Sequence, residues 1–490
     1  MTQATKLSDL GLTARGGANP DITGLCVDSR AVRDGVLFAA LPGSVVHGAE
    51  YIRAAVTRGA SAILTDAEGA AIARDDLGDA ALIVTEDARQ ALAYAAALWS
   101  GAQPETIVAV TGTNGKTSVA TFTRQIWMGL DHAAINIGTT GVEGAWHAPC
   151  AHTTPEPITL HRLLADASGA GITHAAMEAS SHGLDQRRLD GVRLDAAGFT
   201  NFTQDHLDYH HSFDAYFDAK AGLFTRILPE DGVAVINIDD PRGEDMAALA
   251  EDRGQDVLRV GRNAAADLRI LGQRFDATGQ DVRIEWLGEA HQIRLSLIGG
   301  FQADNVVLAA GLVIAGGDDP ARVFAALPQL TGVRGRMELA ATRENGASVF
   351  VDYAHTPDAL KTALKALRPH VMGRIVVVFG AGGDRDTTKR PLMGKAAAEH
   401  ADVLIVTDDN PRSEDPAEIR AAIMAACPDA SNVGDRAEAI LRGVDSLGPG
   451  DALLIAGKGH ESGQTVKGQV YPFDDVEQAS IAVAALDGMI

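Results

Sequence analysis

Cysteine is scarce in this chain, with only 3 among 490 residues, at positions 26, 150 and 427. The three are odd in number, far apart in the sequence and form no C-x-x-C pair. This spacing argues against the disulfide framework of a small secreted domain and against a zinc knuckle.

Long apolar runs are also missing. The most apolar stretch, residues 306–315, has half of the ~20 residues that span a bilayer, and no apolar segment follows Met1–Lys6 as it would in a signal peptide. We therefore expect a cytoplasmic protein with no membrane partner.

Basic residues are in deficit, because 42 Lys and Arg stand against 65 Asp and Glu, a net charge of −23. That balance argues against a nucleic-acid or anionic-membrane binder, which needs a basic surface. A small anion remains compatible with it, because a few well-placed Lys, Arg and backbone N–H groups are enough to hold one.

The chain is long enough for two or three domains at ~150 residues each. Short β-branched runs recur, each ending in a Gly-rich or polar turn before an Ala/Leu-rich helical stretch: Ile107–Val110, Ile375–Phe379, Val403–Val406 and Leu453–Ala456. This alternation predicts an α/β fold with parallel sheets, whose ligands lie beyond the carboxyl ends of the strands. Glycine-containing segments at residues 101–104 and 331–336 are candidate domain boundaries. They divide the chain into predicted domains at 1–98, 99–333 and 334–490.

A phosphate loop is the strongest single motif. The run from Thr111 to Thr117 follows one of these strands and opens a helix predicted over residues 118–130, although Val110 replaces the first glycine of the full pattern. Its backbone N–H groups and the helix N-terminus would face an anion, with a lysine along the phosphates and a threonine hydroxyl on Mg²⁺. The residues predicted to bind ATP here are Gly112, Thr113, Asn114, Gly115, Lys116, Thr117 and Ser118.

The heptapeptide Thr-Gly-Thr-Asn-Gly-Lys-Thr resembles the loop of the Mur ligases and folylpolyglutamate synthases, which form amide bonds with ATP. The resemblance covers the chain from residue 28 to 461. It implies three domains: a smaller N-terminal α/β domain for a UDP-muropeptide, a central ATPase-like parallel sheet, and a C-terminal Rossmann-like domain for an amino acid. It also implies a monomer that uses ATP and Mg²⁺ in the synthesis of peptidoglycan precursors.

Candidate metal ligands follow the loop. Glu178 suits hard Mg²⁺, which prefers oxygen, whereas three nearby histidines (His206, His210 and His211) indicate a local function without saying which one acts. The resemblance implies Glu178 and His206 at a second Mg²⁺ and Thr117 at the first. Lys220 reads on its own as a solvated lysine of an amphipathic helix, and only the resemblance implies that it is carbamylated.

Further nucleotide contacts are implied beyond the loop. Without the resemblance, the segment ending at Asn305 is typical of a helix start, Arg336 of a linker, and the segment from Asp352 of a turn at a strand end. The resemblance implies Asn305 near adenine, Arg336 near phosphate, and Asp352, Tyr353 and His355 near the ribose and base. The last group lies past the predicted domain boundary, which predicts a cleft closed by movement of the C-terminal domain.

The UDP-muropeptide site is likewise implied by resemblance. Its residues are Val27 and Ser29 for the UDP end, and Thr153, Thr154, Ser180, Gln186 and Arg188 for the D-glutamyl peptide. An arginine is the natural partner of the peptide's carboxylate. His152 stands where the family usually has Asn, so the role of that side chain is open.

The run Asp409-Asn410-Pro411-Arg412 accompanies, in this family, the addition of meso-diaminopimelate. Diaminopimelate differs from lysine by a second amino-acid head, whose carboxylate an arginine fork pairs bidentately. Lysine would leave Arg412 unpaired. Glu461 would take the distal ammonium, Gly457 would give a backbone contact, and Arg385 would meet the other carboxylate.

The implied reaction phosphorylates the γ-carboxylate of D-Glu in UDP-MurNAc-L-Ala-D-Glu, and the amine of diaminopimelate then displaces phosphate. Two alternatives stay open at this point. One is a lysine-adding or folylpolyglutamate-type ligase, which should lack Arg412. The other is a dinucleotide-binding protein built on Gly380–Gly383, whose glycine spacing does not match the G-x-G-x-x-G pattern.

Overall fold

The computed structural model describes residues 4–43, 46–150, 152–203 and 207–489. By its internal contacts the chain forms two compact units, residues 1–268 with 308–323 and residues 269–307 with 324–490. Each unit is described by itself. Among the described residues, no helix combines the length and apolar composition needed to cross a membrane.

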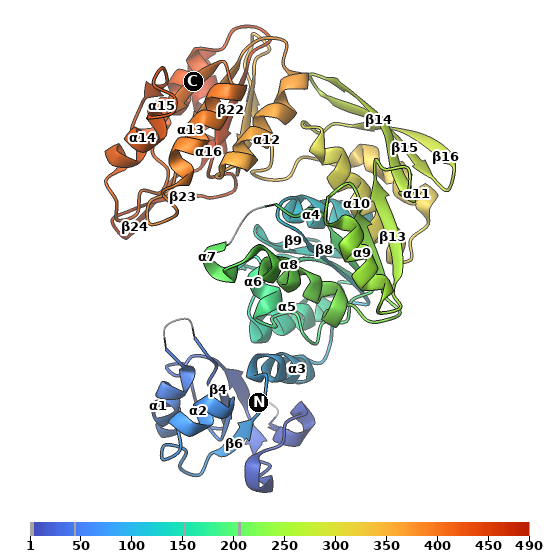
Figure 1. The fold of residues 1–490 in the computed structure, drawn as a ribbon, viewed down its shortest axis with the longest axis vertical. Helices are drawn as coiled ribbons and strands as arrows, with labels where there is room; N and C mark the ends of the chain where they lie inside the picture. The colour runs from blue at the N-terminus through green and yellow to red at the C-terminus, as the bar shows by residue number, and fades with distance from the viewer. Residues whose placement is uncertain (1–3, 44–45, 151, 204–206, 490) are drawn as a thin grey trace. The chain divides into compact units, whose positions relative to one another are not determined.

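The first unit begins with a small α/β region (Figure 1). Its four parallel strands lie in chain order, and their alternate residues pack into two apolar clusters. The strands are β3 (Gly24–Cys26), β4 (Val36–Ala39), β5 (Ala62–Thr65) and β6 (Ala81–Val84), with helices α1 (Ile52–Thr57), α2 (Ala67–Ile72) and α3 (Ala88–Ser100). A short antiparallel pair precedes them, β1 (Thr5–Lys6) with β2 (Asp21–Ile22).

The rest of the first unit is built on a larger sheet in the order β13-β12-β11-β7-β10-β8-β9. All its neighbours are parallel except β9, which returns beside β8 as an antiparallel edge. The strands are β7 (Thr106–Thr111), β8 (Ala134–Gly138), β9 (Gly141–Gly144), β10 (His174–Glu178), β11 (Ala196–Phe199), β12 (Val233–Asn237) and β13 (Asp256–Gly261).

Helices cover this sheet because the central strands are apolar on both faces. Ile107 and Ala109 of β7 belong to the core cluster formed with α5 (Pro157–Gly169), α6 (Ser181–Asp185), α8 (Phe213–Gly222) and α9 (Gly243–Glu251). Val108 and Val110 are buried as well, on the alternate face of the strand. The remaining helices are α4 (Lys116–Gly129), α7 (Leu207–His210), and α10 (Phe301–Ala315) and α11 (Pro320–Ala326), within both of which the unit boundary falls.

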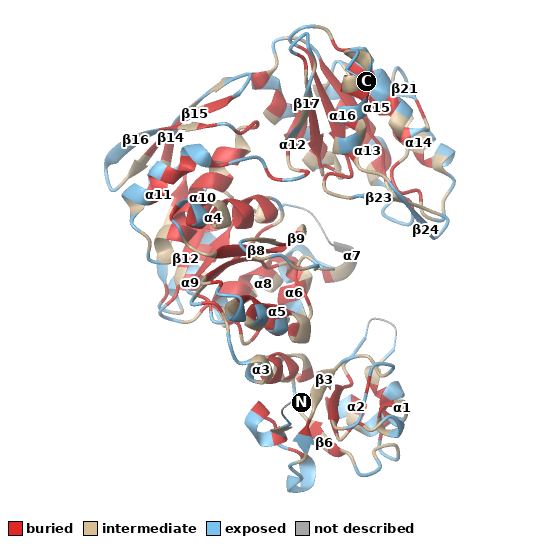
Figure 2. Cartoon of the chain, turned by 180° about the vertical axis from the view of Figure 1, so that it is seen from behind, coloured by how far each residue is buried: buried red, intermediate tan, exposed pale blue. Residues whose placement is uncertain are grey.

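The second unit contains a sheet in the order β17-β18-β22-β19-β20-β21. Only β17 is antiparallel to its neighbour. The strands are β17 (Glu338–Thr342), β18 (Ser348–Asp352), β19 (Ile375–Phe379), β20 (Val403–Val406), β21 (Ser431–Asn432) and β22 (Ala452–Ala456). Its central strands are buried along their length (Figure 2).

Two apolar clusters lie on opposite faces of that sheet. One contains alternate residues of β19 with α12 (Pro357–Leu367), α13 (Lys389–His400) and α14 (Pro416–Met424), and the other contains α15 (Arg436–Asp445) and α16 (Asp475–Leu486). The predicted α/β architecture with helix-covered parallel sheets is confirmed. Two features were not predicted from the sequence. One is the set of polar strands β14 (Leu268–Asp276), β15 (Gly279–Trp286) and β16 (Glu289–Leu295), of which β15 and β16 pair antiparallel, and the other is the hairpin β23 (Gly463–Val466) with β24 (Gln469–Pro472).

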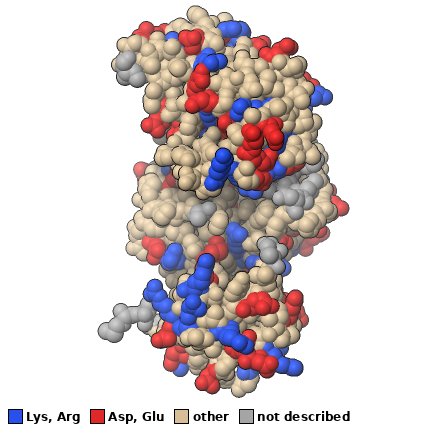
Figure 3. Space-filling model, turned by 90° about the vertical axis from the view of Figure 1, so that its left-hand side faces the viewer, with Lys and Arg blue, Asp and Glu red and all other residues tan. Residues whose placement is uncertain are grey.

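Surface charge is mixed in sign. The face drawn in Figure 3 carries Lys and Arg side chains interspersed with Asp and Glu.

Candidate active site

The phosphate loop joins β7 to α4, as predicted, although the helix begins at Lys116, two residues earlier than expected. Gly112 has φ +145°, and a Cβ there would lie 1.8 Å from the Thr200 hydroxyl oxygen. Gly115 has φ +89° at the turn into the helix. Both positions need glycine, because L side chains rarely adopt such backbone conformations.

Hydrogen bonds fix the conformation of the phosphate loop, two from its own lysine and one to the segment after β11. Lys116 Nζ donates to the carbonyls of Gly112 at 2.8 Å and Thr113 at 2.9 Å. The Asn114 N–H donates to Asn201 Oδ1 at 2.9 Å, from the segment after β11. The lysine ammonium thus lies at the helix N-terminus, where the backbone dipoles favour an anion.

Glu178 lies beside the phosphate loop, next to the Thr117 hydroxyl. It ends β10, which lies between β7 and β8, and is only 2% exposed. Thr117 Oγ1 donates to Glu178 Oε2 at 3.0 Å, and the Thr139 N–H donates to Oε1 at 2.7 Å. A Cβ at Gly138 would lie 2.1 Å from the same carboxylate. A hydroxyl and a buried carboxylate at a phosphate loop fit Mg²⁺, which prefers oxygen ligands. His206, the other predicted ligand, lies outside the described residues.

Lys220 is not a solvated lysine, so that interpretation of its sequence context is wrong. It is 1% exposed, and its Nζ donates to the Gly112 carbonyl at 2.7 Å and lies 4.5 Å from the centre of the Tyr216 ring. The helix α8 buries this side of the stretch against the phosphate loop. Lys220 therefore contacts the same loop carbonyl as Lys116, which sequence periodicity did not indicate.

The residues predicted for the D-glutamyl peptide come together in space near the carboxyl end of β10. Thr154 Oγ1 donates to the Glu178 carbonyl at 2.8 Å and lies 3.0 Å from Ser180 Oγ. Arg188 Nη1 donates to the Thr154 carbonyl at 2.7 Å, and Nη2 donates to Gln186 Oε1 at 2.8 Å. Thr153 joins the set through a 3.0 Å contact with Thr139.

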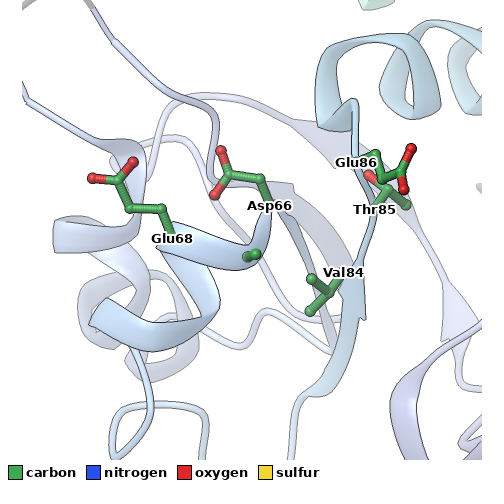
Figure 4. A pocket seen from close by; sticks show the side chains of 6 residues that line it. Asp66, Glu68, Val84, Thr85 and Glu86 are labelled. Atoms are coloured by element: carbon green, nitrogen blue, oxygen red, sulfur yellow. The ribbon is translucent and has the colours of Figure 1, made fainter.

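The segment predicted for the UDP end follows β3. Val27 is exposed and Ser29 half-buried. A cavity of about 400 Å³ in the same α/β region is lined by Asp66, Ala67, Glu68, Val84, Thr85 and Glu86 (Figure 4). Neither Val27 nor Ser29 lines it, and its three carboxylates would repel a diphosphate. This cavity does not suit the UDP end of a muropeptide.

The nucleotide residues predicted beyond the loop lie in the second unit. Asp352 ends β18, and its carboxylate accepts the N–H groups of Met337 at 2.7 Å and Ala354 at 2.8 Å. Burial raises the pKa of this carboxyl. The Arg336 guanidinium stacks 4.5 Å from the centre of the Tyr353 ring, which lies 4.6 Å from the His355 ring. Asn305 is buried in α10, where its side-chain amide donates to Gln302 at 3.2 Å.

The amino-acid residues also meet in the second unit, at the carboxyl edge of its parallel sheet. Asn410 follows β20, and its Nδ2 donates to Glu461 Oε2 at 2.8 Å. Arg412 Nη1 donates to the Gly383 carbonyl at 2.8 Å. Pro411 is buried between them, and Arg385 is exposed in the loop after β19. A Cβ at Gly457 would lie 2.3 Å from Asp409 Oδ2, so that glycine permits a close approach of the two loops.

Three charged residues of this cluster were not predicted from the sequence. Lys458 is completely buried, and its Nζ lies 3.2 Å from Asn410 Oδ1 and 3.4 Å from Asp409 Oδ1. Burial lowers the pKa of this ammonium group. Arg436 forms a buried pair with Asp475 at 2.7 Å and donates to the Ala456 carbonyl at 3.0 Å.

The loops that carry these side chains are conformationally unusual. Asp384, Asn410 and Arg412 have φ of +54°, +43° and +52° although none is glycine. Such residues cluster at ligand sites, where the surrounding contacts hold them. The positions of these loops in the sheet made them predictable from the sequence. Their supports were not, because Arg436 and Asp475 belong to no motif and a buried lysine such as Lys458 is favoured by no sequence pattern.

Together, a phosphate loop in one unit and a cluster of charged strand-end loops in the other define an α/β protein of the phosphate-loop class. The chain belongs to the Mur ligase family. Family models match residues 21–99 (Mur ligase family, catalytic domain), 110–313 (Mur ligase middle domain) and 335–459 (Mur ligase, glutamate ligase domain).

Curated relatives are similar over nearly the whole chain. A protein of Caulobacter vibrioides named UDP-N-acetylmuramoyl-L-alanyl-D-glutamate–2,6-diaminopimelate ligase is 50% identical over 489 residues, covering 98% of this chain and 99% of its own. A protein of Chelativorans sp. with the same name is 51% identical, covering 94% and 95%.

Solved structures of Mur ligases are also similar over nearly the whole chain. A structure of a UDP-N-acetylmuramoyl-L-alanyl-D-glutamate–2,6-diaminopimelate ligase superposes with a TM-score of 0.73 at 33% identity, covering 99% of both chains. A MurF ligase of Thermotoga maritima in complex with ADP shares the fold, with a TM-score of 0.62 at 17% identity over 95% of this chain and 98% of its own.

Proposed function

We propose that this protein is an ATP-dependent ligase that adds meso-2,6-diaminopimelate to UDP-MurNAc-L-Ala-D-Glu. The observation that carries the proposal is the charged loop cluster of the second unit, in which Arg412 and Glu461 are positioned by Gly383 and Asn410. An arginine and a carboxylate held in one cluster match the carboxylate and ammonium of a free amino-acid head. The names of relatives about 50% identical support the same substrate.

The first unit supplies the phosphoryl chemistry. A γ-carboxylate oxygen of D-Glu attacks the γ-phosphorus of ATP, and the bond to the bridging oxygen breaks as ADP leaves. Lys116 and the loop N–H groups lie where negative charge on the transferring group would be stabilised. Thr117 and Glu178 would hold Mg²⁺, which when bound neutralises phosphate charge. His206 is proposed as a further ligand by resemblance.

The second step forms the amide bond. The diaminopimelate amine attacks the acyl carbon of the acyl phosphate, phosphate leaves with the electron pair of the C–O bond, and the amine loses a proton. Carbamylation of Lys220 would join CO₂ to the amine with loss of a proton, giving an N–H that keeps the bond to the Gly112 carbonyl and an anionic end beside the loop. The contact of Nζ with the Gly112 carbonyl supports this modification, because an anionic end at the phosphate loop would help to position a metal.

The remaining assignments extend this proposal. Thr153, Thr154, Ser180, Gln186 and Arg188 would bind the peptide, and Val27 and Ser29 the UDP end. Asn305, Arg336, Asp352, Tyr353 and His355 would contact the nucleotide, and Asp409, Pro411, Gly457 and Arg385 would complete the diaminopimelate site. We further propose a cytoplasmic monomer with working domains at 1–98, 99–333 and 334–490, as the family resemblance implies.

The test supplies ATP, Mg²⁺ and UDP-MurNAc-L-Ala-D-Glu with either meso-diaminopimelate or L-lysine, and measures phosphate release and the ligated product. We expect release that requires both the muropeptide and diaminopimelate. Release with lysine but not with diaminopimelate would overturn the proposed specificity. A change in nicotinamide absorbance without ADP formation would instead support the dinucleotide-binding alternative.

Glu461 predicts a pH dependence of diaminopimelate binding. Burial raises the pKa of this carboxyl above its ordinary 4.5, with the Asn410 hydrogen bond opposing the rise. As the pH falls from 7, Glu461 therefore becomes neutral earlier than an ordinary carboxyl and loses its attraction for the distal ammonium. We expect the KM for diaminopimelate to rise toward acid pH while the KM for ATP does not follow it.

The matched variant is Glu461→Gln, which keeps the shape and an acceptor oxygen but does not titrate. Its KM for diaminopimelate should be raised at pH 7 and should stay flat over the same pH range. A wild-type profile that the Gln variant reproduces would assign the titration to another group.

A further inference from the structure

Two histidines and an aspartate form a cluster at the edge of the first unit's large sheet that faces away from the phosphate loop. His174 is the first residue of β10, whose last residue is Glu178. His132 lies two residues before β8, the neighbouring parallel strand. Asp318 comes from the turn between α10 and α11. Because β8 and β10 are parallel, both histidines lie at the amino edge of the sheet, and Thr117 and Glu178 lie at the carboxyl edge.

The three side chains converge. One potential ligand atom from each lies within 4.8 Å of the other two. His132 Nε2 lies 2.8 Å from Asp318 Oδ1, and the two imidazole rings stack with centroids 4.1 Å apart. The side chain of His132 is 31% exposed and that of Asp318 is 12% exposed, whereas His174 is buried. The cluster is therefore largely enclosed by protein, and His132 is the side chain that reaches solvent.

A second layer of contacts orients these groups. Trp127 Nε1 donates to Asp318 Oδ2 at 3.1 Å, which leaves Oδ1 directed at His132. The Thr173 hydroxyl lies 2.8 Å from His174 Nδ1, so Nε2 is the ring nitrogen left for a ligand. Metal-binding histidines and carboxylates are typically fixed through their second polar atom in this way.

We propose that His132, His174 and Asp318 bind a divalent transition-metal ion of the zinc class, at a site separate from the proposed magnesium site. Two imidazoles and one carboxylate are borderline ligands that suit Zn²⁺, whereas Mg²⁺ prefers an all-oxygen shell. Three protein ligands leave a fourth position for water, at the exposed side of His132.

Such an ion would join segments far apart in the sequence. Trp127 lies in the last turns of α4, the helix that begins at Lys116 of the phosphate loop, and His132 follows that helix directly. Asp318 is 186 residues away from His132. The ion would thus fix the far end of the phosphate-loop helix to β10 and to the α10–α11 turn, and its effect would be to stabilise the first unit rather than to take part in the reaction.

The experiment uses the full, untagged chain in saturating Mg²⁺, so that the proposed magnesium site is already filled. Co²⁺ is titrated as a spectroscopic probe of ligand field, and Zn²⁺ is titrated against it by competition. We expect one equivalent of Co²⁺ with the visible absorption of a tetrahedral or five-coordinate ion, displaced by Zn²⁺. Bound Co²⁺ should also quench tryptophan fluorescence, because Trp127 contacts Asp318.

The variants are His132→Gln and Asp318→Asn, which keep size and hydrogen-bonding groups, with His147→Gln as the control because His147 is exposed outside the cluster. Both cluster variants should weaken Co²⁺ and Zn²⁺ binding by more than the about 10- to 100-fold typical of losing an outer contact, whereas the control should leave it unchanged. Trp127→Phe should keep the absorption band and lose most of the quenching.

Two results would overturn the proposal. One is the absence of Co²⁺ and Zn²⁺ binding by the wild type in saturating Mg²⁺. The other is binding that persists unchanged in His132→Gln and Asp318→Asn, which would locate the ion elsewhere and leave the cluster as a hydrogen-bonded support. Thermal unfolding separates these roles further, since a metal site predicts a zinc-dependent rise in melting temperature that both cluster variants lose.

Discussion

Replacement of Lys116 by methionine is expected to lower kcat for phosphate release by about 10²–10³-fold, the cost of removing one preorganised electrostatic donor from a transition state. Methionine keeps an unbranched side chain of similar length and removes the ammonium that lies 2.8 Å from the Gly112 carbonyl and 2.9 Å from that of Thr113. The loss should fall on kcat, because charge on the transferring phosphoryl group develops in the transition state. The KM for diaminopimelate should change little.

Lys395→Met serves as the matched control, since the Lys395 side chain is 68% exposed on α13 and its i,i+4 partner Glu399 is exposed as well. Its activity should equal that of the wild type. Thermal unfolding of Lys116→Met separates a lost charge from a disordered loop. A Lys116→Met enzyme that folds normally and releases phosphate at the wild-type rate would remove this lysine from the mechanism.

The phosphate loop was predictable because its determinants are local. A strand, a Gly-Lys-Thr turn and a helix follow one another directly between residues 106 and 129, and the two strained glycines at 112 and 115 are part of the motif itself. Glu178 was predictable for a different reason. Parallel neighbouring strands place their carboxyl ends at one edge, so the end of β10 meets the end of β7 wherever the two strands pair.

Burial of single polar side chains was not predictable in the same way. The helix containing Lys220 offers no periodicity that separates a solvated lysine from one packed under the loop, and only the tertiary contact with Gly112 decides. The cluster around His132 shows the same limit, because Asp318 is distant in sequence and belongs to no motif.

In the second unit, the strand-end loops were predictable from the sequence, but the side chains that support them were not. The resemblance implied both Asn410 and Glu461 at the diaminopimelate site, and the structure brings their side chains to 2.8 Å. Lys458 sits inside the same motif as Glu461, yet a buried lysine is exceptional enough that no sequence pattern favours it. The hairpin β23–β24 was missed because each of its strands has only 4 residues. It donates the Thr465 N–H to Asn410 at 2.8 Å.

The choice between diaminopimelate and lysine should depend on Arg412. Its Nη1 is fixed on the Gly383 carbonyl at 2.8 Å, and φ of +52° holds its backbone in a conformation that few residues adopt without support. The guanidinium offers a planar fork that pairs with a carboxylate through parallel hydrogen bonds. Lysine lacks the second carboxylate and would leave this charge unmatched. A site built around a polar group rejects the analogue without it by up to ~10⁴-fold in kcat/KM.

Arg412→Ala is therefore expected to raise the KM for diaminopimelate by about 10- to 150-fold, equivalent to the about 1.5–3 kcal/mol of a charge-assisted pair. Arg412→Lys should recover only part of the loss, because an ammonium keeps the charge but not the fork. Arg442→Ala is the control, an arginine with a 58% exposed side chain on α15 of the same unit. Parallel measurements with L-lysine should show selectivity falling in Arg412→Ala, because only diaminopimelate binding is weakened. An equal rise in the KM for ATP and for diaminopimelate would show that Arg412 supports the unit as a whole and makes no direct contact with the amino acid.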